Sequence, residues 1–275
     1  MNPNSALYWF PRLERAGVKT LRTSFVEFDW KAVLPMLDGE SNRAISDLVD
    51  ETVQACYGFR LPVFLRTDLA SAKHSGPSAY KVSDVRRDVP NVLLKTLEEV
   101  IGIKDLFPSA IMVRPWLRLD HRFVAFGGHP IASEWRVFAS AERVECIHFY
   151  WEEDAIRFFG SKGVKEPDNW VDQLRLQRKQ RLPALHLLKA VKAAKACPAS
   201  RYWSVDFALD RDGSHWLIDM ATAAASWHPD DCRNRLRFLA PEEHECANCH
   251  RKQALAETDL DGDGFCKDCC RKEDA

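Results

Sequence analysis

The chain has 275 residues, of which 46% are hydrophobic, 11% aromatic and 29% charged. This composition allows a large buried core and excludes an intrinsically disordered protein. With 39 basic and 40 acidic residues the formal net charge is −1, which does not fit a general nucleic-acid coat protein, although a local basic patch is compatible with it. Residues 1–9 do not resemble a secretory signal, and no apolar run reaches the roughly 18 residues that span a bilayer. We therefore expect a cytoplasmic protein that does not contact a membrane.

Apolar residues at helical or alternating spacing predict the main helices and strands. The first clear helix is expected over residues 41–57, with Ser41 as its N-cap and Gly58 closing it. There follow in chain order a strand at 61–65, a helix at 91–101, strands at 111–113, 134–139 and 144–151, a basic helix at 172–197 that Pro183 breaks or kinks, and strands at 202–209 and 215–220. Several strands follow one another without a helix between them, which favours an α+β fold over a doubly wound sheet.

The most informative stretch, residues 202–220, predicts a β-hairpin that brings two aspartates together. A four-residue loop, Arg211–Ser214, makes Asp206 the cross-strand partner of Asp219, with their Cβ atoms about 5 Å apart. Two like charges this close destabilise a sheet, and a bound divalent cation that prefers oxygen ligands removes the penalty. We interpret the pair as a Mg²⁺ site; a shifted register, or pairing with basic side chains, is the alternative.

This hairpin and three upstream segments resemble, in order, motifs of the ATP-grasp superfamily. VDFALDRDGSHWLIDM is similar to its metal-binding hairpin, and Ser133–Ala139 (SEWRVFA) is similar to a strand of one branch. That branch includes uncharacterised bacterial and phage proteins and a eukaryotic chaperone family that assembles an initiation factor. Ile111–Leu117 (IMVRPWL) resembles the hinge that meets adenine, and Phe64–Gly76 (FLRTDLASAKHSG) resembles a strand and loop with phosphate-binding residues. The resemblance extends over roughly residues 8–230.

The resemblance implies an ATP-grasp fold over residues 1–240, in which two α+β subdomains clamp a nucleotide, and it implies individual roles. Asp206 and Asp219 would hold Mg²⁺, and Arg136 and Lys73 would be catalytic through contacts to the transferred phosphate. The residues implied in ATP binding are Arg66, Lys73, Arg114, Pro115, Trp116, Glu134 and Arg136. The assignment of the basic residues to ATP binding also has independent support from their charge, because guanidinium and ammonium groups match phosphate oxygens.

Simpler interpretations of three of these residues stay open. Glu134 and Arg136 are two residues apart on an expected strand and therefore share a face, where they could form only an exposed ion pair. Lys73 could be a solvated loop lysine.

The implied chemistry is ligation. ATP would phosphorylate a carboxylate, and an amine would then displace phosphate from the acyl phosphate, while the protein positions the groups and neutralises charge. One position departs from the family: the Asn that commonly follows the last acidic residue by two positions is Ala221 here, with Ser226, His228 or Asp230 as candidate substitutes. A non-enzymatic, ATP-bound assembly factor is therefore the second hypothesis, and a scaffold that binds protein or RNA is the third.

Residues 241–275 predict a separate zinc ribbon, with the boundary near Ala240–Pro241. The segment has too few large apolar residues to fold around a core of its own, so it needs a structural metal ion or disulfide bonds to hold it together. Its spacing, C-x2-C-x16-C-x2-C, is typical of a structural Zn²⁺ site in which every ligand comes from the protein. The expected ligands are Cys246, Cys249, Cys266 and Cys269, with Cys270, His250 and His244 as alternatives.

The charge of this ribbon favours a protein partner or a stabilising cap over nucleic acid. It contains ten acidic and five basic residues, so its field repels phosphate backbones. The basic helix expected at 172–197 is the better candidate for an anionic partner, and a solvated helix face is the alternative.

Overall fold

The computed structural model consists of two compact units, Met1–Ala225 and Ser226–Ala275. It describes residues 2–70, 80–101, 107–159, 166–238, 243–245 and 252–254. The predicted domain boundary at Ala240–Pro241 lies outside the described residues and stays a prediction.

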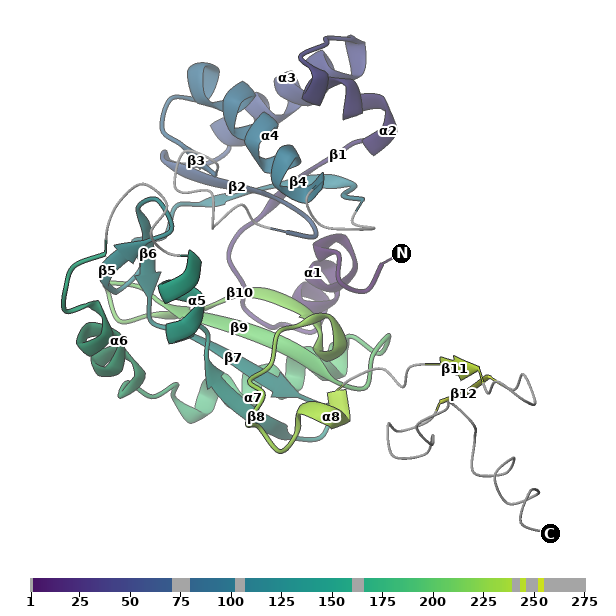
Figure 1. The fold of residues 1–275 in the computed structure, drawn as a ribbon. Coiled ribbons are helices and arrows are strands. Elements are labelled where there is room, and N and C mark those ends of the chain that lie inside the picture. The colour runs from purple at the N-terminus through teal and green to yellow at the C-terminus, as the bar shows by residue number, and fades with distance from the viewer. Residues whose placement is uncertain are drawn as a thin grey trace. The chain divides into compact units, whose positions relative to one another are not determined.

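The first unit mixes helices with antiparallel sheets, which confirms the predicted α+β class (Figure 1). Its helices are α1 (Ala6–Arg15), α2 (Trp30–Val33), α3 (Arg43–Tyr57), α4 (Val85–Ile101), α5 (Glu153–Phe159), α6 (Trp170–Arg178) and α7 (Ala184–Ala196), with 3₁₀ turns at Leu34–Asp38 and Ala223–Ala225. Its strands are β1 (Ser24–Glu27), β2 (Val63–Thr67), β3 (Lys81–Val82), β4 (Ala110–Pro115), β5 (His121–Ala125), β6 (His129–Ala132), β7 (Glu134–Ala139), β8 (Val144–Phe149), β9 (Trp203–Leu209) and β10 (His215–Thr222).

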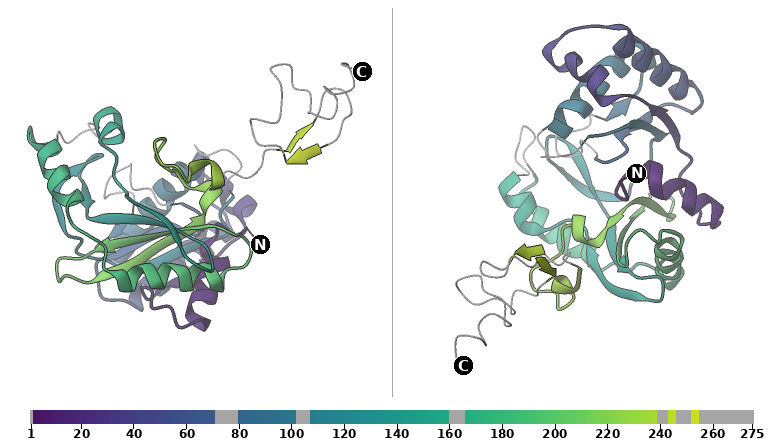
Figure 2. Two further views of the ribbon diagram at one scale, coloured as in Figure 1. Left: turned by 90° about the horizontal axis from the view of Figure 1, so that it is seen from below. Right: turned by 90° about the vertical axis from the view of Figure 1, so that its right-hand side faces the viewer.

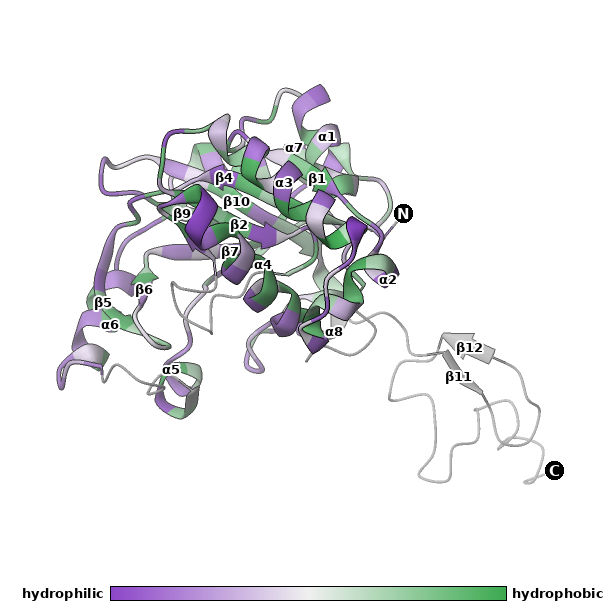
Figure 3. Cartoon of the chain, turned by 90° about the horizontal axis from the view of Figure 1, so that it is seen from above, coloured by the Kyte–Doolittle hydropathy of each residue, from purple (hydrophilic) through white to green (hydrophobic). Residues whose placement is uncertain are grey.

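The first sheet has the strand order β1-β4-β2-β3, and helices α3 and α4 cover one of its faces (Figure 1). Val63 and Leu65 of β2 point into the core beneath these helices. Because side chains alternate along a strand, Phe64 and Arg66 point to the opposite face. Helices α3 and α4 each carry both hydrophobic and hydrophilic residues, as Figure 3 shows. One face of this sheet is therefore a core, and the other is available to a site.

The second sheet has the strand order β10-β9-β7-β8, and α7 lies along one face of it (Figure 2). Trp135 and Val137 of β7 and Phe207 of β9 belong to the core on that side, together with residues of α1 and α7. Glu134 and Arg136 alternate with these residues and lie on the other face. The sequence therefore divides this sheet into an apolar face and a charged one.

A two-stranded hairpin, β5–β6, carries a third small core next to these sheets. Its turn contains three consecutive residues with positive φ, Phe126 at 49°, Gly127 at 71° and Gly128 at 103°. The left-handed conformation at Phe126 is unusual for a non-glycine residue. Its ring is buried against Trp151, with 5.8 Å between the ring centroids, which holds the turn in place.

The boundaries of some elements differ from those that the sequence predicts. The N-cap of α3 is Asn42 and not Ser41, because the Asn42 side chain accepts a hydrogen bond of 2.9 Å from the Ile45 amide. Helix α4 begins at Val85 with Pro90 inside it, and Asp84 accepts the Arg87 amide at 3.2 Å. The basic stretch 172–197 forms two helices, α6 and α7, which confirms the predicted break at Pro183. Pro183 is the N-cap of the second helix.

In the second unit, the structure describes α8 (Arg235–Phe238) and an antiparallel pair of strands, β11 (Glu243–Glu245) and β12 (Lys252–Ala254). The predicted zinc ligands lie outside the described residues, so the ribbon stays a prediction: Cys246, Cys249, Cys266 and Cys269, with the alternatives Cys270 and His250. Within the described parts of the chain, no helix combines the length and the apolar character that a membrane span requires.

Candidate functional site

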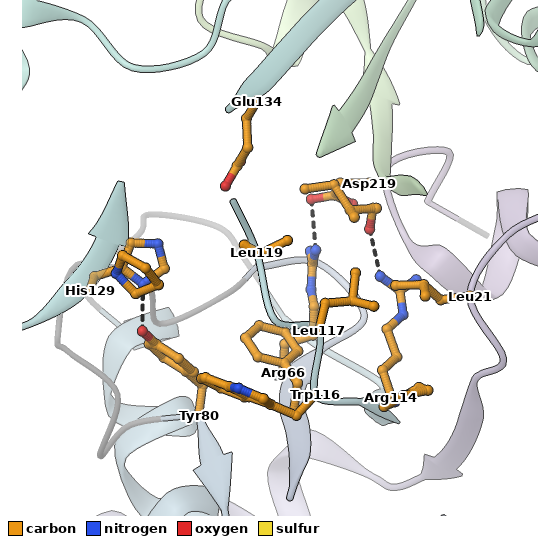
Figure 4. Close-up of a pocket in the computed structure, with 14 residues that line it drawn as sticks. Leu21, Arg66, Tyr80, Arg114, Trp116, Leu117, Leu119, His129, Glu134 and Asp219 are labelled. Carbon is orange, nitrogen blue, oxygen red and sulfur yellow. Dashed lines mark hydrogen bonds and ion pairs between the residues drawn. The ribbon is translucent and has the colours of Figure 1, made fainter. Parts of the chain in front are cut away.

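A pocket in the first unit is lined by residues of both four-stranded sheets and of the β5–β6 hairpin. One part of its wall is aromatic and apolar, and another part is charged (Figure 4). The side chains on each part of the wall indicate what kind of molecule the pocket suits.

The aromatic wall centres on Tyr80, which is almost fully buried. Its ring lies 5.2 Å from that of Phe64 and 6.0 Å from that of Trp116, to which it is nearly parallel at 12°. Its hydroxyl group is hydrogen-bonded to Nδ1 of His129 on β6, and this contact links the two sides of the pocket. Burial, and secondarily the charge of Glu134, raise the pKa of Tyr80, so the phenol stays neutral. Flat rings of this kind suit a planar, aromatic ligand.

Two arginines of the first sheet form much of the charged wall, and both point toward β10 (Figure 4). Arg66 on β2 donates from Nη1 to Oδ2 of Asp219 at 2.7 Å. Arg114 on β4 donates from Nη1 to the Ile218 carbonyl oxygen at 2.5 Å and from Nε to Oγ1 of Thr23 at 3.0 Å. The strands place them together, because Arg114 is the cross-strand partner of Phe64, two residues before Arg66.

Arg114 is a buried cation whose described hydrogen bonds go to uncharged oxygens. Burial first, and then the charge of Arg66, lower its pKa to about 9, while Asp219 acts in the opposite direction. A buried charge that is poorly compensated costs free energy, and an anion next to it would recover part of that cost. The charged wall therefore favours a negatively charged group.

The two aspartates of the hairpin are direct cross-strand partners, as the sequence predicts. The loop is longer than expected, because His215 pairs with Leu209. Asp210 stabilises it by accepting the backbone amides of Asp212 at 3.0 Å and Ser214 at 2.8 Å. A bulge in β10 then restores the predicted pairing at the aspartates.

Asp206 is paired with Arg136, its cross-strand partner on β7. The guanidinium group donates from Nε to Oδ1 at 2.9 Å and from Nη2 to Oδ2 at 2.8 Å. Burial by itself would lower the pKa of Arg136, but the charge and hydrogen bonds of Asp206 outweigh burial and raise it. The pairing with basic side chains that the sequence left open is therefore present at both aspartates, together with their direct opposition.

The pocket brings together most of the residues that the sequence singles out. Its lining includes Arg66, Arg114, Pro115, Trp116, Glu134 and Asp219. Arg136 and Asp206 lie on the charged face of the second sheet beside Asp219 and are not in the lining itself. Lys73 lies outside the described residues.

Sequence reasoning identified Trp116 but missed the other rings of the pocket, those of Phe64, Tyr80 and His129. Phe64 is two residues from Arg66 on β2 and therefore shares its face, a signal that the sequence contains. Tyr80 and His129 meet only in the folded chain, 49 residues apart, and no sequence spacing points to their contact.

No family model and no curated protein matches this chain. Among solved structures, Cdc123 from Schizosaccharomyces pombe is similar over 80% of this chain and 85% of its own, with 13% identity and a TM-score of 0.47. An ATP-grasp protein with a RimK domain from Sphaerobacter thermophilus is similar over 78% of this chain and 58% of its own, with 11% identity and a TM-score of 0.40. The ATP-grasp ligase PsnB, solved with minimal precursor, Mg and ADP, matches 79% of this chain and 49% of its own, at 13% identity and a TM-score of 0.39. The two four-stranded sheets with their covering helices agree with the α+β class that the sequence predicts.

Proposed function

We propose that the pocket binds ATP, with the base against the aromatic wall and the phosphates against Arg66 and Arg114. The observation that carries this proposal is that flat rings and buried guanidinium groups line one pocket. A nucleotide has both of the matching parts, a planar base and an anionic chain. Guanidinium groups bind phosphate oxygens through charge-assisted hydrogen bonds, which are strong in a site that excludes water.

Asp206 and Asp219 have the chemistry of a Mg²⁺ site. Both are carboxylates on one face of the sheet, and Asp219 lines the pocket. Hard oxygen atoms of this kind are the ligands that Mg²⁺ takes, commonly together with substrate phosphates. Bound there, the ion would neutralise charge on the transferred phosphate. Both carboxylates accept hydrogen bonds from arginines, so an ion at this place must share them or displace the arginines.

Ala221 limits how many metal ions this face can hold. It is the cross-strand partner of Ser204, whose hydroxyl group donates to Oδ1 of Asp206 at 3.4 Å. The position at which related proteins commonly have an Asn ligand therefore offers a methyl group. We infer a site for one Mg²⁺ ion and not two.

The reaction that suits this site best is ATP-dependent ligation of a carboxylate to an amine through an acyl phosphate. Arg136 and Arg66 would hold the transferred phosphate, and Lys73 is proposed to assist them. No nucleophilic side chain is needed, because the protein positions reactants and neutralises charge. The substrate class is proposed from the ATP-grasp resemblance alone.

A second candidate is a non-enzymatic, ATP-bound assembly factor. Ala221 favours it, because the catalytic pattern of the ATP-grasp superfamily has a metal-binding Asn at this position and alanine cannot bind a metal. A scaffold that uses the predicted zinc ribbon to bind protein or RNA is a further proposal. Release of ADP that depends on an added carboxylate and amine would select the ligase, and ATP binding without turnover would select the assembly factor.

The proposal is tested by titrating ATP into the purified chain with and without Mg²⁺, using calorimetry. We expect saturable binding that Arg114→Gln weakens by about tenfold or more, since a charged partner is lost from a buried site. Arg157→Gln is the matched control, because that arginine pairs with Glu153 on α5 and is not among the residues that line the pocket. If the wild type does not bind ATP under either condition, the nucleotide proposal is wrong.

A further inference from the structure

The two aspartates of the proposed Mg²⁺ site are held by their arginines in different ways. At Asp206 the guanidinium group of Arg136 covers both carboxylate oxygens, and the two side chains are only 13% (Arg136) and 6% (Asp206) exposed. At Asp219 the guanidinium group of Arg66 binds one oxygen, the other accepts the Met220 amide at 3.0 Å, and the side chain is 33% exposed. A guanidinium group is therefore paired with each carboxylate, but Asp219 is the more accessible of the two to an entering cation, and at Asp206 both oxygens are covered.

We propose that Arg136 is an internal counter-ion that takes the place of the metal at Asp206. It leaves this carboxylate only when a phosphate group offers its guanidinium another partner, so that metal and nucleotide bind together and the metal alone binds poorly. This inference deepens the proposed function and rests on it. It assigns Arg136 a positioning role toward the metal in addition to its proposed contact with phosphate.

The charges at the site explain why the two events are coupled. If Arg136 left with nothing in exchange, the buried Asp206 would lose its counter-charge directly opposite Asp219, which keeps only Arg66, and a buried guanidinium group would lose its partner. If a metal ion entered while Arg136 stayed, two cations would share one small carboxylate. When Mg²⁺ and a phosphate chain enter together, the ion replaces the guanidinium at Asp206 and the phosphate replaces the carboxylate at Arg136. Each charge then has a partner before and after binding.

The surroundings of Arg136 allow this exchange without unfolding the sheet. Its guanidinium group lies 4.8 Å from the ring centroid of Tyr150, which offers a surface along which the side chain can move. Glu134 lies on the same face of β7 and lines the pocket, so the strand already places Arg136 beside the proposed nucleotide.

The test measures binding of Mn²⁺, a stand-in for Mg²⁺, by electron paramagnetic resonance in the absence of nucleotide. We expect the wild type to bind Mn²⁺ more weakly than about 1 mM, in the range of the weakest protein cation sites. In Arg136→Gln the carboxylate is released, and we expect Mn²⁺ to bind about tenfold tighter or more. The same variant should bind ATP more weakly, so one substitution shifts the two affinities in opposite directions.

Three variants guard against simpler explanations. Asp206→Asn added to Arg136→Gln should abolish the gain in Mn²⁺ affinity, which locates it at this carboxylate. Arg136→Lys keeps the charge but loses the two-point contact, and should give an intermediate Mn²⁺ affinity if the glutamine variant does not fold. Arg157→Gln, an arginine in a surface ion pair, should leave Mn²⁺ binding unchanged.

The inference is overturned if the wild type binds Mn²⁺ alone as tightly as Arg136→Gln does, or if the double variant keeps the gain. A wild type that does not bind ATP would instead contradict the proposed function, and the Mn²⁺ comparison would still decide whether Arg136 blocks the cation position. The two failures are therefore distinguishable.

Discussion

Leu217 and Asp219 are two residues apart on β10, yet Leu217 pairs with Phe207 and Asp219 pairs with Asp206, which places them on opposite faces of the sheet. In a regular strand they would share a face. The ladder is interrupted between them, and the extra residue, Ile218, reverses the alternation. Leu217 is therefore buried in the core while Asp219 lines the pocket.

The same bulge also contributes a hydrogen-bond acceptor to the charged wall of the pocket. The carbonyl oxygen of Ile218 accepts the hydrogen bond from Arg114, so the irregular residue contributes through its backbone. Bulges often lie beside functional sites, where they redirect a side chain. Here the bulge directs a carboxylate toward two arginines of the other sheet.

Asp219 should make ATP binding depend on metal. In Asp219→Asn we expect ATP to bind with nearly the same affinity with and without Mg²⁺, because the ion loses its exposed carboxylate ligand while Arg66 and Arg114 remain to hold phosphate. Calorimetric titrations in Mg²⁺ and in EDTA measure the difference. Asp212→Asn, an exposed aspartate in the turn of the same hairpin, is the control and should retain the wild-type difference. A Mg²⁺ effect that persists in Asp219→Asn would place the metal elsewhere.

The Arg136–Asp206 pair should matter more for stability when one partner is removed than when both are. Asp206→Asn leaves a guanidinium group buried without its counter-charge, and we expect a loss of about 3 to 5 kcal/mol in the free energy of unfolding. Arg136→Met combined with Asp206→Leu should recover most of that loss, because apolar side chains can replace a buried pair. Urea denaturation measures both.

The exposed ion pair Arg43–Asp47 on α3 provides the control for these stability measurements. Its side chains are 94% and 59% exposed, so Asp47→Asn should change stability by about 0.5 kcal/mol or less. Equal losses at the two pairs would show that Asp206 is solvated in solution and would contradict the buried geometry.

Sequence patterns predict the parts of this site that depend on neighbouring strands. The spacing of Glu134 and Arg136 was sufficient to put them on one face. The four-residue loop assumed at 211–214 put Asp206 opposite Asp219, and this pairing holds although the loop is one residue longer, because the bulge at Ile218 compensates for the shift. The bulge at Ile218 was not predictable, because it changes which side chains face the core only once the two strands have paired. The partners of the aspartates could not be assigned either, since Arg66 comes from the other sheet, 153 residues away from Asp219.

Trp116 should be the main contact for the base. Trp116→Leu removes an aromatic surface from the wall, and we expect a loss of about 1 kcal/mol in binding, or roughly fivefold in ATP affinity. A free triphosphate chain has no base, so its affinity should not change in this variant. Trp227→Leu, at an exposed tryptophan outside the pocket lining, is the control. If Trp116→Leu weakens ATP and triphosphate equally, the base binds elsewhere.

Two histidines on the apolar side of the second sheet should make stability fall in mild acid. The rings of His186 on α7 and His215 on β10 lie 4.9 Å apart. Burial lowers both pKa values below the ordinary 6.5, and the charge of Lys189 lowers them further, while Asp210 partly opposes the shift at His215. The unfolded chain therefore binds more protons than the folded one as the pH drops below 6.5, so stability is complete above that value and decreases below it.

Replacing the two histidines should flatten this dependence. We expect the urea midpoint of the wild type to fall between pH 7 and pH 5, and that of His186→Gln with His215→Gln to fall less. Asp88, whose pKa the hydrogen bond from Arg87 lowers to about 2, acts at a more acidic pH and does not interfere. A midpoint that falls equally in both proteins would show that other groups take up the protons.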